Sequence, residues 1–83
     1  MRQVPERVNR EWIDSLEDTD LLDVEARVRA RFTLLERREK KERGDKYQLM
    51  RGSAELMEAW DRWSRILAAT RERHLVPLKA ATS

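Results

Sequence analysis

Four residues that interrupt helices divide this chain, and they stand far apart. Pro5 suits the first turn of a helix, where a missing backbone N–H costs nothing, and Pro77 follows the last helical signal. Gly44 and Gly52 bracket a short connection in the middle. The long intervals between these residues predict three helices, over about 5–16, 20–43 and 53–75, followed by a polar tail over 77–83.

The middle segment carries the strongest helical pattern. Its apolar residues recur at steps of three and four and form one stripe, made of Leu21, Val24, Val28, Phe32 and Leu35. Four acid-before-base pairs at i, i+4 support the helix: Asp23 with Arg27, Glu25 with Arg29, Glu36 with Lys40, and Glu39 with Arg43. The stripe ends at Leu35 while the charged pattern continues, so we expect the last two turns to project past the core.

The other two helices are amphipathic as well. Val8, Trp12 and Leu16 share one face of the first. Ser53 is a typical N-cap residue for the third, although a start at Asp45 is the alternative. The expected fold is all-α, with a short N-terminal helix followed by an antiparallel helical hairpin.

Composition limits what such a hairpin can do alone. A single domain over 1–83 buries a modest core, and the chain has no cysteine for disulfides. We therefore expect a partner, most simply a homo-oligomer. No apolar run is long enough to span a membrane and no signal peptide is present, so the expected location is the cytoplasm, with no membrane partner.

Catalytic and cofactor chemistry finds no support in the sequence. His74 is the single histidine, and no nucleophile motif or glycine-rich phosphate loop occurs. The acidic run over 17–25 lacks the glycine of a calcium loop and is interpreted as helix capping. We expect no enzyme activity, no catalytic residue, no cofactor and no metal.

A basic run follows the apolar stripe. Six basic residues against four acidic ones over 36–46 leave a net charge of +2. One interpretation is a solvated helix end whose cations complement the helix dipole. The other is contact with nucleic-acid phosphates, for which the candidates are Arg37, Arg38, Lys40, Lys41 and Arg43.

Two tryptophans three residues apart define the second candidate site. Helical spacing places them on one apolar face of the third helix with further large side chains: Leu56, Met57, Trp60, Trp63 and Leu67. Such residues form an intrachain core, or the centre of a protein interface, which favours aromatic residues and methionine. We expect both roles for this face.

The second half of the chain resembles the small terminase subunits of phages. Tyr47, the pair Gly52-Ser53, the helix through Trp60 and Leu67, and the tail segment 75–77 carry the resemblance. His74 stands where the family pattern has a glycine. The resemblance implies a ring-forming, non-catalytic viral protein in the host cytoplasm that binds duplex DNA and presents it to a large packaging ATPase.

A different class of function remains open beside DNA packaging. The near-zero net charge favours a protein-binding adaptor, structural component or inhibitor that docks its aromatic helix face on another protein without nucleic acid. A regulatory or antitoxin-like hairpin that folds on its target is a third hypothesis.

Overall fold

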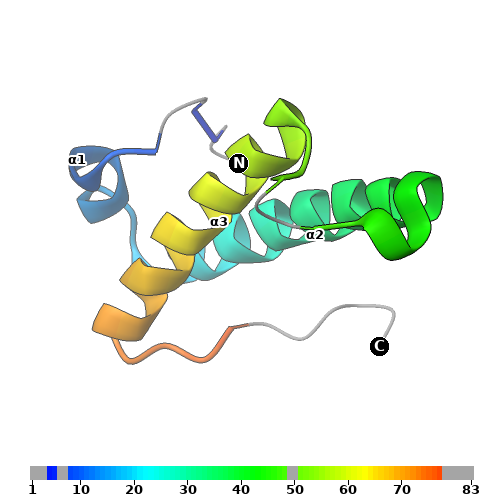
Figure 1. Cartoon of the computed structure of the whole chain (residues 1–83). Helices are drawn as coiled ribbons and strands as arrows, with labels where there is room; N and C mark the ends of the chain where they lie inside the picture. The colour runs from blue at the N-terminus through cyan, green and yellow to red at the C-terminus, as the bar shows by residue number, and fades with distance from the viewer. Residues whose placement is uncertain (1–3, 6–7, 49–50, 78–83) are drawn as a thin grey trace.

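The computed structural model describes residues 4–5, 8–48 and 51–77 and shows a helical fold (Figure 1). Its elements are α1 (Arg10–Asp14), α2 (Asp18–Arg43), the short 3-10 helix η1 (Gly44–Lys46) and α3 (Ala54–Glu72). The described residues contain no strand. The prediction of an all-α chain with two long helices packed against each other is confirmed, and α3 lies across α2.

Helix α2 has the charge pairs that its sequence predicts. Asp23–Arg27, Glu25–Arg29, Glu36–Lys40 and Glu39–Arg43 all form, with nitrogen–oxygen distances of 3.7, 3.2, 3.5 and 3.5 Å. The apolar stripe is buried as expected. Two acidic residues, Glu25 and Glu39, lie on the same buried side of α2.

The core consists of two clusters that meet at one side chain. The first contains Val8, Ile13, Leu16, Leu21, Val24, Val28, Ile66 and Ala69. The second contains Phe32, Leu35, Leu56 and Ala59. Trp63 packs against both, with its ring centroid 5.1 Å from that of Phe32. It therefore joins the two halves of the α2–α3 interface.

The buried face of α3 differs from the predicted one. Its buried residues are Leu56, Ala59, Ile66, Ala69 and Thr70. Trp60 and Leu67 are only half-buried. The small side chains of Ala59 and Ala69 let α3 approach α2 closely, so Ile66 is fully buried in the contact while Trp60 and Leu67 lie at its edge.

Helix α1 is shorter than the predicted 5–16. The Asn9 side chain accepts a hydrogen bond from Trp12 N at 2.8 Å, which places the N-cap at Asn9 and leaves Pro5 outside the helix. Ile13 rather than Trp12 is its buried residue. The predicted residues 6–7 lie outside the described part of the chain.

The predicted projection of the last two turns of α2 is wrong. Glu39 is buried, because Ser53 N and Ser53 Oγ both donate hydrogen bonds to its carboxylate at 2.8 and 2.9 Å. The chain turns at Gly44, whose φ of 56° suits glycine, and folds back along α2. Ser53 also accepts from Leu56 N, so the third helix starts at Ala54, as the capping signal indicated.

Arg73 links the end of α3 to the junction between α1 and α2. Its guanidinium donates to the backbone oxygens of Leu16 and Ile13 at 2.8 and 3.0 Å and pairs with Asp18 at 3.1 Å. Helix α3 ends at Glu72, three residues before the predicted end, because His74 takes the left-handed conformation, with φ 57°. An Arg10–Glu72 pair at 2.6 Å reinforces this junction.

Glu25 is a fully buried carboxylate beside Trp63. Burial raises the pKa of its carboxyl group, while Arg29 and the Trp63 indole act in the opposite direction. Neither its oxygens nor Trp63 Nε1 finds a partner with hydrogen-bond geometry among the described residues, so the indole compensates the carboxylate only in part. The ionised form of Glu25 therefore destabilises the fold.

The Glu39–Ser53 contact gives the first prediction. Replacing Glu39 with Ala removes two charge-assisted hydrogen bonds at the start of α3, and we expect a loss of about 2 kcal/mol in the free energy of unfolding, measured by urea titration. Glu42→Ala is the matched control, since Glu42 is an exposed glutamate one turn further on, and should stay within about 0.5 kcal/mol of the parent chain. Equal losses in both variants would contradict this role.

A second prediction concerns pH. The pKa of Glu25 is raised in the folded state. Its favourable contribution to the free energy of unfolding is therefore complete below the pKa of the unfolded chain and is lost as pH rises through the pKa of the folded chain. Glu25→Gln should therefore raise the melting temperature by a few degrees at pH 7, and the gain should shrink toward pH 4. Glu58→Gln, which removes an exposed carboxylate from α3, should not reproduce that pH-dependent gain.

Candidate nucleic-acid interface

The five predicted phosphate contacts occupy the last turns of α2, but the structure separates them into two groups. Arg37, Arg38 and Lys41 are exposed. Among the described residues, no carboxylate forms an ion pair with any of these three. Their charges are therefore available to an external anion.

Lys40 and Arg43 instead contribute to the fold. Lys40 pairs with Glu36 at 3.5 Å and lies 5.4 Å from the centre of the Tyr47 ring. Arg43 pairs with Glu39 and donates a hydrogen bond to the backbone oxygen of Arg51 at 2.8 Å. Both side chains hold the connection between α2 and α3, here called the returning connection, against α2. They are therefore weaker candidates for phosphate contact.

Basic residues also line α2 further toward its N-terminus than the 36–46 run suggested, and together they form a basic face. Arg27 and Arg31 precede Arg38 and Lys41 at helical spacing, and steps of four, seven and three residues keep all four on one side of α2. At 1.5 Å per residue, the stripe from Arg27 to Lys41 is about 21 Å long. This helical spacing was the signal that sequence reasoning missed, because it considered only contiguous charges.

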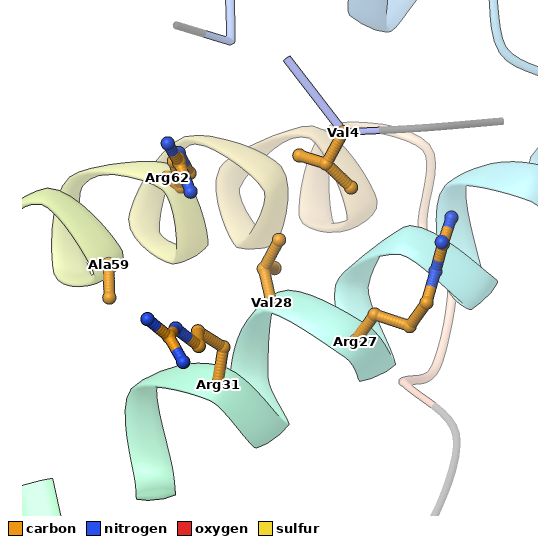
Figure 2. A pocket seen from close by; sticks show the side chains of 6 residues that line it. All are labelled: Val4, Arg27, Val28, Arg31, Ala59 and Arg62. Atoms are coloured by element: carbon orange, nitrogen blue, oxygen red, sulfur yellow. The ribbon is translucent and has the colours of Figure 1, made fainter. Parts of the chain in front are cut away.

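A hollow of about 200 Å³ opens beside the N-terminal part of this face (Figure 2). Its lining combines three arginines from two helices with an apolar floor: Val4, Arg27, Val28, Arg31, Ala59 and Arg62. Arg31 reaches toward Ala59 and pairs with Glu55, whereas Arg27 lies on the other side of Val28 and pairs with Asp23.

A second hollow, of about 280 Å³, lies at the start of α3. Arg38 and Arg43 line it together with Ser53 and Glu55. The α3 terminus does not offer a separate anion site there, because Glu39 already accepts from Ser53 N. Arg38 is nevertheless held at the rim of this hollow, next to the other exposed cations of α2.

The residues predicted as a protein interface do not form one exposed patch. Leu56 is completely buried and Trp63 lies between the two core clusters. Met57, Trp60 and Leu67 remain half-buried along one edge of α3. Trp60 also contacts Phe32 and Trp63, with ring centroids 5.4 and 5.6 Å away. Trp63 is half-buried as well, so Leu56 alone of the five is fully covered, and the accessible part of the predicted surface is a strip of partly covered side chains.

The described residues form neither a metal site nor a membrane-spanning helix. No three histidine, cysteine or acidic side chains come together there in a way that suits a metal ion. Nor does any helix in that part of the chain have the length and apolarity needed to cross a bilayer.

Tyr47 provides a spectroscopic test of the returning connection. Burial and the hydrogen bond that its hydroxyl donates to Glu36 at 2.9 Å raise the pKa of Tyr47 to about 12. It is the single tyrosine of the chain, so tyrosinate absorbance reports it alone. Glu36→Gln should lower that pKa toward 10, while Glu42→Gln should leave it unchanged. An unperturbed titration in the parent chain would contradict the contact.

The chain was compared with protein-family models, curated proteins and solved structures, and none of the three comparisons gives a match.

Proposed function

We propose that this chain is a non-enzymatic, self-associating helical protein that binds the phosphates of duplex DNA. The observation that carries the proposal is the exposed basic group of α2, made of Arg37, Arg38 and Lys41. Cations on a rigid helix contact phosphates without reading bases, so the binding is expected to be independent of sequence.

The packing of the acids supports this assignment. Of the four acidic residues in the 36–46 run, Glu39 is buried and Glu36 is engaged by both Lys40 and Tyr47. Their charges are thus directed away from the exposed cations, and Glu42 and Asp45 remain as the exposed acids of the run. The acidic residues of this run therefore weaken the attraction between the exposed cations and phosphate less than their number in the sequence suggests.

The biological setting comes from the resemblance in the second half of the chain. Small terminase subunits bind viral DNA without catalysing its packaging, and this chain offers no catalytic constellation in its sequence. A role in DNA packaging, with a large packaging ATPase as partner and the host cytoplasm as location, fits a helical chain that binds phosphates and self-associates.

The test uses a matched pair of triple variants in a mobility-shift assay with duplex DNA at several salt concentrations. Arg37→Ala/Arg38→Ala/Lys41→Ala should weaken binding and lower the salt slope by about three, since each phosphate contact contributes about 0.9. Lys46→Ala/Arg65→Ala/Arg71→Ala removes the same charge from three exposed positions elsewhere and should change the slope by less than one. Identical slopes for the two variants would refute the assignment of the site.

The second candidate function is docking of another protein on the edge of α3. Met57, Trp60 and Leu67 are half-exposed there, and a methionine beside a partly covered indole suits an interface centre. In that case Trp60→Ala would abolish binding of a protein partner, and the parent chain would show no salt-dependent DNA binding. The basic face favours the DNA assignment.

A further inference from the structure

The charge on the outer side of α2 changes sign partway along the helix. Its N-terminal part presents Asp20 and Asp23, and the following turns present Arg27 and Arg31 on the same side. All four side chains are exposed or half-exposed. One helix face therefore carries an acidic half followed by a basic half.

The residues between and beyond these charges are suited to close helix contact. Ala26 and Ala30 are small and lie on the outer side of α2, so another helix can approach closely there. Leu34 follows one turn later and is 53% exposed, one of two large hydrophobic residues that are exposed in the described part of the chain. An exposed leucine beyond two alanines is the pattern of a helix face that a second helix covers.

We propose that two copies of this chain associate through this face, with their α2 helices antiparallel and crossing near Ala26 and Arg27. Antiparallel pairing places the acidic half of each copy against the basic half of the other, so the same attraction occurs twice about a two-fold axis. Leu34 of one copy then covers Thr19 of the other. Parallel pairing would place like charges together along the whole contact.

The existing ion pairs allow this contact. Arg27 is 3.7 Å from Asp23 and Arg31 pairs with Glu55, and both arginine side chains remain at least one-third exposed. A guanidinium has five N–H donors, so each arginine can keep its own carboxylate and bind one of the second copy. Asp20 has no ion-pair partner among the described residues and gains one in the dimer.

The dimer also gives a spacing, and this step rests on the proposed DNA function. Arg38 lies about 11.5 residues from the crossing point, so the two Arg38 side chains are about 35 Å apart along the helix axes at 1.5 Å per residue. The two-fold axis leaves both on the same side of the dimer. This separation matches one turn of duplex DNA, about 34–36 Å.

The association is tested by light scattering without DNA at low salt. The parent chain should reach twice its 10.0 kDa mass. Asp20→Lys/Asp23→Lys makes the face all basic and Arg27→Glu/Arg31→Glu makes it all acidic. Each variant alone should be monomeric at concentrations at least tenfold above the parent dimerisation midpoint, and an equimolar mixture should form a heterodimer. A monomeric parent chain, or variants that dimerise like it, would overturn the proposal.

A single substitution tests the same contact in case the double charge variants misfold. Ala30→Glu adds one charge to an exposed helical alanine at the contact, whereas Ala68→Glu makes the same change on the exposed side of α3. Only Ala30→Glu should shift the dimerisation midpoint to higher concentration. The reverse result would place the contact on α3 and overturn the proposal.

DNA measurements then separate the two proposals. Monomeric Ala30→Glu should have about half the salt slope of the parent dimer, because each copy contributes its own phosphate contacts. If the parent chain dimerises as described but binds no DNA, the proposed function fails and the dimer stands. If it binds DNA as a monomer, the dimer contact fails alone.

Discussion

The contact between Trp63 and the two core clusters holds the structure together. The two clusters lie at opposite ends of the α2–α3 interface, and the Trp63 ring packs against both of them. Truncating a fully buried aromatic side chain to alanine costs about 3–5 kcal/mol, whereas an exposed ion pair contributes about 0–1 kcal/mol. Trp63 is only partly buried, so its contribution lies below the first figure but above that of one surface ion pair. The many charge pairs on the surface therefore shape α2, but the indole fixes how α3 lies across it.

The same region of the core contains a buried acid that is compensated only in part. Glu25 sits on the buried face of α2 next to the indole, and Arg29 covers its outer side. The arginine and the indole each favour the ionised carboxylate, and burial opposes it. At the other end of α2, Glu39 is satisfied by Ser53, so the two buried acids have opposite effects on stability.

Sequence reasoning predicted the parts of the fold that depend on local spacing. The stripe from Leu21 to Leu35, the four ion pairs of α2 and the cap at Ser53 follow from contacts within one or two turns. It did not predict that Ile66 rather than Trp60 lies at the centre of the interface, because helical periodicity does not say how closely two helices approach. Nor did it find Arg31 and Arg62 at one hollow, since they come from different helices. Lys40 and Arg43 were grouped with the exposed cations because their further contacts, with the Tyr47 ring and the Arg51 backbone oxygen, lie on the returning connection.

Arg73 has a consequence for the order in which the molecule is built. The backbone oxygens of Leu16 and Ile13 receive their hydrogen bonds from a guanidinium 57 and 60 positions later in the chain. A ribosome therefore completes α1 and α2 well before the residue that fastens them together exists, and contacts of such long sequence separation form late in folding. Until Arg73 has left the exit tunnel, only apolar contacts such as those of Ile13 and Leu16 with α2 can hold the N-terminal segment in place.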